Sequence, residues 1–153
     1  MKMEVANLTP QIAVASKRTA VSMRNIHEAI GEMCGKLLAY LSEQGKEMSG
    51  PPYLKYTNMK PDFSEFDIEW GFPVADPVPD FGEFYMTKTY GGKAILMTHK
   101  GPYPTLERAY SAIMAYEKEH SLENTGVSYE IYLNDADKTP AEELLTQIVY
   151  PIR

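Results

Sequence analysis

An internal repeat constrains the fold of this chain more than any other feature of its sequence. Tyr53-Leu54-Lys55-Tyr56 is matched by Tyr129-Glu130-Ile131-Tyr132, at a shift of 129 − 53 = 76 residues. Ala39-Tyr40 is matched by Ala115-Tyr116, at a shift of 115 − 39 = 76 residues. Phe72-Pro73-Val74 is matched by Tyr150-Pro151-Ile152, at a shift of 150 − 72 = 78 residues. The repeat predicts two related modules. A residue that differs between equivalent positions is a candidate for function, and the sharpest difference is Leu54 against Glu130.

Size and charge exclude several classes of protein. The 153 residues suit a single domain, residues 1–153, made of two half-sized modules that share a core. The net charge of −6 and the pI of about 5.1 argue against direct nucleic-acid binding, which requires clustered Lys and Arg. The acidic potential favours cationic small molecules instead. No segment resembles a signal peptide or a membrane span, so we expect a cytoplasmic protein without a membrane partner.

The sequence carries no metal or cofactor motif. The lone Cys34 leaves no intrachain disulfide and no thiolate cluster, and it falls in an apolar helical row as a buried thiol. His27, His99 and His120 lack the spacing of metal ligands. Neither a nucleophile elbow nor a phosphate-binding glycine loop occurs. We therefore expect no metal and no cofactor.

The first module, about residues 11–75, is predicted to have the order β-α-β-β. Asn25 and Glu28 fit a capping box that would start the helix, and Gly45 would stop it. Alternation of apolar and polar residues supports the last strand of the module. The predicted strands are residues 11–23, which could break near Lys17-Arg18, residues 53–57 and residues 66–72.

The second module, about residues 81–153, repeats this order after a proline-rich linker at residues 75–82. The helical row expected to face inward comprises Leu106, Tyr110, Ile113, Met114 and Glu117. The predicted strands are residues 84–100, interrupted at Gly91-Gly92, residues 127–133 and about residues 144–152. The fold class is therefore α+β: two β-α-β-β modules with antiparallel sheets and one helix each, related by pseudo-twofold symmetry about a central ligand groove.

Glu130 lies in a predicted strand whose residues alternate between two faces. The face expected beneath the helix carries Val127, Tyr129, Ile131 and Leu133, and the other face carries Ser128, Glu130 and Tyr132. The second face could simply meet solvent, with Glu130 an ordinary surface charge. A shared cleft fits better, because the matching face of the first module carries Leu54 and Tyr56. Burial would raise the pKa of Glu130 and an incoming cation would favour its ionised form, so it suits either a counter-ion or a general base.

Aromatic residues and methionines can line such a cleft. The chain has 11 Tyr, five Phe, one Trp and nine Met residues. Trp70 and Phe72 share a strand face, and Tyr150 lies on the equivalent face of the last strand. Aromatic walls hold cationic ligands with roughly 0.5–2 kcal/mol per cation–π contact, although each ring could equally belong to the core. Glu69 is the chief rival of Glu130 as the functional carboxylate, because it neighbours Trp70.

Three motifs give the chain a resemblance to a known family. His99-Lys100-Gly101-Pro102-Tyr103, the run from Tyr129-Glu130-Ile131-Tyr132 to Leu133-Asn134-Asp135, and Tyr150-Pro151-Ile152 resemble the GyrI-like (gyrase-inhibitor-like) small-molecule-binding domain. That domain also serves as the effector-binding domain of multidrug-responsive transcription activators. The resemblance extends from about residue 11 to residue 153. It implies two modules around a groove for lipophilic, often cationic compounds.

The resemblance also implies roles for particular residues. A strand glutamate contacts the ligand in that family, and Glu130 occupies its motif here. Tyr110 and Tyr150 lie near positions where the family places pocket aromatics, whereas the other candidates follow from strand parity and the helical row. The predicted ligand-binding residues are Glu130, Tyr110, Tyr150, Trp70, Phe72, Tyr56, Tyr132, Leu54 and Met114.

Three hypotheses for function follow. The first is a stand-alone, multidrug-type binding protein for lipophilic, cationic aromatic compounds, with Glu130 as counter-ion. The second is a hydrolase of strained cyclopropanoid electrophiles, because some similar stand-alone members catalyse that reaction; Glu130 would be the general base and Tyr150 a neighbouring catalytic aromatic. The third is a protein-interaction module of gyrase-inhibitor type, which would give the chain a protein partner.

Overall fold

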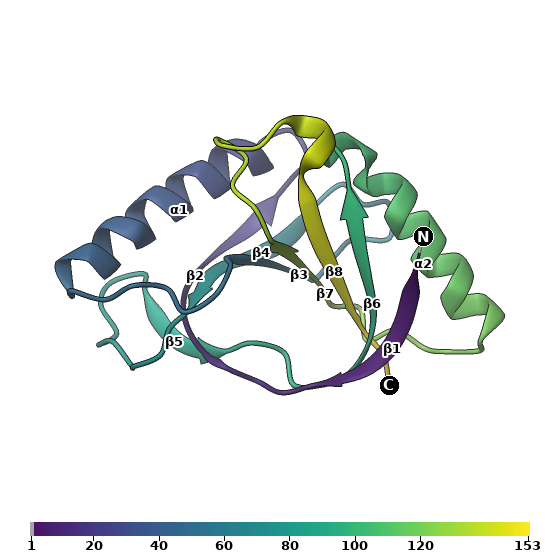
Figure 1. Cartoon of the computed structure of the whole chain (residues 1–153), viewed down its shortest axis with the longest axis horizontal. Coiled ribbons are helices and arrows are strands. Elements are labelled where there is room, and N and C mark those ends of the chain that lie inside the picture. Colours follow the sequence, from purple (N-terminus) through teal and green to yellow (C-terminus); the bar gives the residue numbers. More distant parts are fainter. Residues whose placement is uncertain (1) are drawn as a thin grey trace. The chain divides into compact units, whose positions relative to one another are not determined.

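The structure, a computed structural model, describes residues 2–153; residue 1, which the predicted domain includes, lies outside the described residues. The chain divides into two compact units. Unit 1 comprises the described part of Met1–Thr9 together with Gly91–Arg153, and unit 2 comprises Pro10–Tyr90. Each unit combines antiparallel strands with one long helix (Figure 1). The predicted α+β class is therefore confirmed.

Unit 2 contains a four-stranded antiparallel sheet in the order β3-β4-β2-β5, with helix α1. Its elements are β2 (Ile12–Val21), α1 (Ile26–Glu43), β3 (Tyr53–Thr57), β4 (Phe66–Pro73) and β5 (Tyr85–Lys88). Without β5, this is the β-α-β-β order predicted for the first module.

Unit 1 contains four antiparallel strands, in the order β1-β6-β8-β7, with helix α2. Its elements are β1 (Met3–Leu8), β6 (Gly92–Lys100), the short helix η1 (Tyr103–Thr105), α2 (Leu106–Glu119), β7 (Ser128–Tyr132), the short helix η2 (Ala141–Glu143) and β8 (Leu145–Pro151). The predicted strand at residues 84–100 is divided, since β5 pairs with β2 and β6 pairs with β8. Strand β1 was not predicted, because its short and partly charged sequence carries no clear alternation.

The two units repeat the same strand register. Leu54 of β3 pairs with Trp70 of β4 in unit 2, and Glu130 of β7 pairs with Ile148 of β8 in unit 1. The paired positions are related by the shifts found in the sequence, 130 − 54 = 76 and 148 − 70 = 78. The duplication predicted from the sequence therefore extends to the pairing of individual residues.

Of the two predictions made for the ends of α1, the stop is confirmed and the capping box is wrong. Asn25 precedes the helix, but its side-chain oxygen accepts a hydrogen bond from the Ser22 backbone N–H at 2.9 Å and caps no helical N–H. The predicted capping box is therefore wrong. The stop at Gly45 is confirmed: Gly45 has φ 65°, its N–H donates to the Ser42 carbonyl, and the Lys46 N–H donates to the Leu41 carbonyl. This is the Schellman arrangement, which favours glycine.

Strand β2 continues through the predicted break. Lys17 and Arg18 both pair with β4, and the register becomes irregular only between Arg18 and Val21, where Ala20 has φ 56°. The basic pair therefore lies within the strand, and the irregularity follows it.

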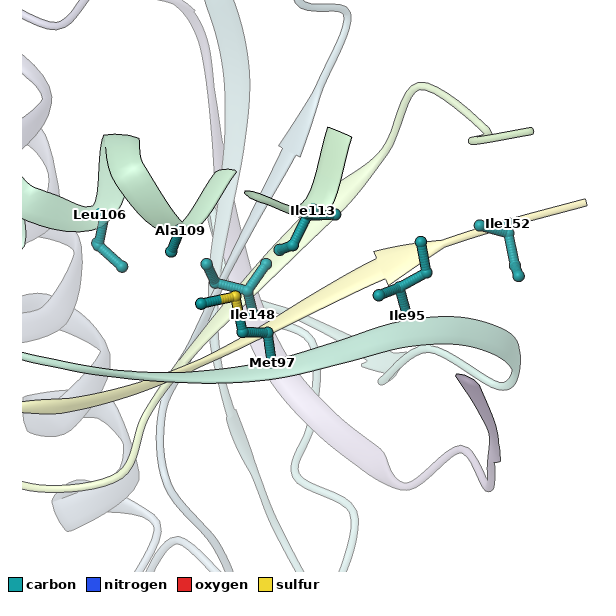
Figure 2. Close-up of a cluster of buried hydrophobic side chains, with 7 residues drawn as sticks. All are labelled: Ile95, Met97, Leu106, Ala109, Ile113, Ile148 and Ile152. Carbon is teal, nitrogen blue, oxygen red and sulfur yellow. The ribbon is translucent and has the colours of Figure 1, made fainter. Parts of the chain in front are cut away.

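Helix α2 packs on one face of the unit 1 sheet. The buried cluster in Figure 2 contains Ile95 and Met97 of β6, Leu106, Ala109 and Ile113 of α2, Ile148 of β8, and Ile152 just after β8. Each fully buried aliphatic side chain contributes about 1.5–3 kcal/mol to folding. This contact fixes which side of the sheet the helix covers.

The side of β7 that faces α2 differs from the prediction. Glu130 pairs with Ile148, and directly paired residues in an antiparallel sheet point to the same face, so Glu130 lies on the side of α2. Tyr129 pairs with Val149 on the opposite face. The prediction that Tyr129 and Ile131 lie beneath the helix is therefore wrong. Tyr129 and Glu130 are both buried, so alternation of apolar residues does not identify the helix side.

The first prediction concerns Gly71 of β4. A Cβ at this position would lie 2.6 Å from the ring of Tyr53, so we expect Gly71→Ala to lower the free energy of unfolding by about 1–3 kcal/mol. The matched control is Gly31→Ala within α1, where nothing lies within 4 Å of the added carbon and we expect a gain of about 0.5–1 kcal/mol. Urea unfolding measures both changes. Equal effects of the two substitutions would contradict the steric account.

Candidate functional site

Glu130 is a buried carboxylate that accepts hydrogen bonds from two tyrosines. Its side chain is only 4% exposed. The Tyr110 hydroxyl donates to Oε2 at 2.6 Å, and the Tyr132 hydroxyl donates to Oε1 at 2.7 Å. Short bonds to a charged acceptor are among the strongest in proteins. Three residues predicted for the site therefore meet within unit 1.

Local structure explains how these side chains meet. Glu130 and Tyr132 are two residues apart on β7 and therefore share the face that α2 covers. Tyr110 lies beside the buried row Leu106, Ala109 and Ile113 of α2, and it packs against the same hydrophobic cluster. The helix–sheet contact thus brings the Tyr110 hydroxyl to the carboxylate.

Tyr103 extends the aromatic surroundings of the carboxylate. Its ring meets that of Tyr132 edge to face, with centroids 5.7 Å apart and planes at 72°. Burial raises the pKa of the Tyr103 hydroxyl, and the negative charges of Asp135, Glu130 and Asp137 raise it further. The sequence pointed to Tyr103 only through the motif that contains it. The electrostatic environment here opposes a second anion and favours a cation.

A hydrogen-bonded chain fixes the segment that leads into α2. His99 Nε2 lies 2.8 Å from Thr105 Oγ1, and Thr105 Oγ1 donates to the Pro102 carbonyl at 2.6 Å. Because the Thr105 proton is used in this way, His99 Nε2 is the donor to Thr105. These hydrogen bonds account for the His99-Lys100-Gly101-Pro102-Tyr103 motif, which positions Tyr103 and leads into α2.

The predicted residues of unit 2 lie on the helix side of their own sheet. Leu54, Trp70 and Phe72 are buried, and Tyr56 is partly buried. Leu54 pairs with Trp70, whose ring meets Phe72 edge to face at 6.0 Å. Arg18, on this same face of the sheet, forms a 3.0 Å ion pair with Glu32 of α1. These four residues thus form the apolar counterpart of the Glu130 region.

Tyr150 and Met114, the other predicted site residues, flank the α2 interface of unit 1. Tyr150 is partly buried, and its hydroxyl lies 3.4 Å from Glu117 Oε1. Burial and the negative charge of Glu117 raise the pKa of Tyr150 to about 12. Met114 is 44% exposed, so the prediction that it belongs to an inward row is wrong. The core of α2 consists of Leu106, Ala109 and Ile113.

Glu117 was not selected as a site residue from the sequence. Its Oε2 accepts hydrogen bonds from the backbone N–H and the side-chain amide of Asn124, both at 2.7 Å. The repeat contains the signal that could have identified it, because the equivalent position, 117 − 76 = 41, is the buried Leu41.

Glu69, the rival carboxylate, lies on the other face of its sheet. It accepts hydrogen bonds from Tyr53 at 3.0 Å and from Tyr85 at 2.7 Å. Burial and the hydrogen bond to Glu69 raise the pKa of Tyr85. Glu69 is the cross-strand partner of both Lys17 and Lys55, so positive charges flank it. It neighbours Trp70 in sequence, but adjacent strand residues point to opposite faces.

The described residues include a hollow that lies apart from the predicted site residues. Within residues 2–153, no group of three His, Cys, Asp or Glu side chains could hold a metal ion. A hollow of about 350 Å³ in unit 2 is lined by Gly45, Lys46, Glu47, Val74, Ala75 and Asp76. None of the predicted site residues lines it. Neither α1 nor α2 of the described residues is long and apolar enough to cross a membrane.

A profile of the GyrI-like small molecule binding domain matches residues 1–153. The chain therefore belongs to the GyrI-like small-molecule-binding domain family. No curated protein sequence matches the chain significantly.

Solved structures share the fold. The EcmrR C-terminal domain is 17% identical, with a TM-score of 0.86 over 99% of this chain and 97% of that chain. A hydrolase encoded by lin2189 from Listeria innocua is 14% identical, with a TM-score of 0.70 over 99% and 92%. SAV2435, solved bound to tetraphenylphosphonium, is 14% identical, with a TM-score of 0.68 over 100% and 94%. At these identities the likeness shows a common fold.

The second prediction concerns the pH dependence contributed by Tyr150. Its pKa is about 12 in the folded protein against 10.0 for an unperturbed tyrosine, so its contribution to stability is complete below pH 10 and is lost as the pH rises from 10 to 12. We expect Tyr150→Phe to flatten the decline in the free energy of unfolding across this window. Urea unfolding at several pH values measures the slope. Parallel declines in the two proteins would contradict the prediction.

Proposed function

We propose that this protein binds lipophilic, cationic aromatic compounds, with Glu130 as the counter-charge. The observation that carries the proposal is the buried carboxylate with a tyrosine hydroxyl on each oxygen. A buried charge is costly unless it is compensated, and proteins retain such groups where function needs them. A cation bound beside Glu130 recovers part of that cost.

The surroundings of Glu130 suit an aromatic cation more than a metal ion. Tyr103, Tyr110 and Tyr132 offer ring surfaces, and the two hydroxyls that donate to the carboxylate fix its orientation. Cation–π attraction contributes about 0.5–2 kcal/mol per ring. The family is one of small-molecule-binding domains, and SAV2435, which shares the fold, was solved with the lipophilic cation tetraphenylphosphonium.

The third prediction separates charge from shape. Tetraphenylphosphonium and tetraphenylborate are close in size and shape but opposite in charge. We expect the protein to bind the phosphonium at least about tenfold more tightly, and we expect Glu130→Gln to weaken phosphonium binding by about tenfold or more, which corresponds to about 1.4 kcal/mol. Isothermal titration calorimetry measures both affinities.

Glu69→Gln is the matched control for this experiment. Glu69 also accepts hydrogen bonds from two tyrosine hydroxyls, but it lies on the opposite face of its sheet and has cross-strand lysine partners. We expect this variant to bind the phosphonium as the unmodified protein does. Loss of binding in Glu69→Gln alone would transfer the role to Glu69, and equal affinity for the two probes would refute the counter-charge.

A second candidate function is the hydrolysis of strained cyclopropanoid electrophiles. The observation that favours it is the pairing of buried Glu130 with a phenol at 2.6 Å, together with the fold shared with a protein described as a hydrolase. Glu130 would take a proton from water while the water oxygen bonds to a ring carbon. The broken carbon–carbon bond would leave its electron pair on the activating group, which then takes up a proton. Water is thereby added across the bond that opens.

The fourth prediction tests this reaction. Incubation of the protein with an acceptor-substituted cyclopropane in ¹⁸O-labelled water should give the ring-opened alcohol with one labelled oxygen, detected by mass spectrometry. We expect Glu130→Gln to slow the reaction by about 100-fold or more, as for loss of a general base. Tyr150→Phe tests the second predicted catalytic residue. Product formed equally fast in Glu130→Gln would remove Glu130 from the mechanism.

A further inference from the structure

Helix α2 carries a second row of side chains beside its buried core. Tyr110, Met114 and Glu117 lie four and three residues apart, so they occupy neighbouring positions along one side of the helix. Tyr110 and Glu117, seven residues apart, are separated by roughly 10 Å along the helix axis. Tyr110 contacts Glu130 and Glu117 contacts Tyr150. A carboxylate–tyrosine pair thus lies toward each end of this row.

Glu117 is held in position but retains free acceptor capacity. Asn124 donates two hydrogen bonds to Oε2, both at 2.7 Å, whereas Oε1 has only the 3.4 Å contact from the Tyr150 hydroxyl. None of the ion pairs found among residues 2–153 includes Glu117. The side chain is partly exposed, so one of its oxygens remains available to a ligand.

The repeat shows that the fold of a module does not require the polar pair formed by Glu117 and Tyr150. The positions in unit 2 equivalent to Glu117 and Tyr150 are Leu41 and Phe72, at shifts of 117 − 41 = 76 and 150 − 72 = 78, and both are buried. Unit 2 therefore packs its helix with apolar side chains at the places where unit 1 has a carboxylate and a phenol. The exchange parallels that of Leu54 for Glu130.

Met114 supplies an exposed apolar side chain at a helix position between Tyr110 and Glu117. It is 44% exposed, and the equivalent Leu38 of α1, at 114 − 38 = 76, is 42% exposed. An unbranched, polarisable methionine adapts to ligands of different shape. Tyr110 with its β7 partner Glu130, the apolar Met114 and the charged Glu117 therefore follow one another along the helix.

We propose that unit 1 binds dicationic ligands, in which two cationic centres are joined by an apolar spacer. Glu130 receives one centre, the spacer lies over Met114, and Glu117 with Tyr150 receives the other. This inference rests on the proposed function and specifies its ligand class. When both charges engage, the second contact is intramolecular and the affinity rises without a new binding partner.

The fifth prediction compares a dication with a monocation of equal chain length. We expect decamethonium, with ten methylenes between two trimethylammonium groups, to bind at least about tenfold more tightly than decyltrimethylammonium. Isothermal titration calorimetry gives the affinity ratio.

Substitution of Glu117 tests the assignment directly. We expect Glu117→Gln, which keeps an acceptor for Asn124, to lower the dication-to-monocation affinity ratio to about one. Glu119→Gln, an equal loss of charge at an exposed position of α2, should leave the ratio unchanged. Thermal unfolding verifies that both variants fold.

The outcomes distinguish this inference from the function on which it rests. If tetraphenylphosphonium fails to bind, the proposed function is wrong. If tetraphenylphosphonium binds but decamethonium has no advantage over decyltrimethylammonium, only the dication inference is overturned. An advantage that persists in Glu117→Gln would likewise overturn the role of Glu117.

Discussion

The packing of each helix against one face of its own sheet is the constraint on which the other features of this structure depend. In unit 1, Ile113 of α2 lies against Ile148 of β8, and the strand register places Glu130 directly beside Ile148. The carboxylate is buried because the helix covers that face of the sheet. The same contact brings Tyr110 within hydrogen-bonding distance. Burial, the phenol contacts and the selectivity proposed for cations therefore share one cause.

The duplicated sequence predicted much of this arrangement, because a repeat preserves register. The shift of Leu54 onto Glu130 identified equivalent positions that pair with Trp70 and Ile148 in their own sheets. The contrast between the apolar Leu54 and the charged Glu130 could be recognised in the sequence without knowledge of the fold. Most strands were located from alternation and turn residues, since these signals are local. The groove between the modules stays a prediction.

Features that depend on long-range contacts could not be predicted in this way. Strand β1 forms by pairing with β6, which lies about ninety residues later, and its own sequence carries little strand pattern. Both faces of β7 hold buried residues, so periodicity did not reveal which face meets α2. The Asn25 side chain accepts its hydrogen bond from the Ser22 backbone N–H instead of from a helical N–H. Glu69 was expected to rival Glu130 because it precedes Trp70 in the sequence. The pleat of the strand, however, points the Glu69 and Trp70 side chains to opposite faces of the sheet.

The hydrogen bond between Tyr110 and Glu130 also joins α2 to β7 near the middle of the helix. A cation that draws the carboxylate toward itself must weaken or redirect this bond. Under the proposed function, occupancy of the site would therefore change how firmly the whole of α2, 14 residues long, is held against its sheet.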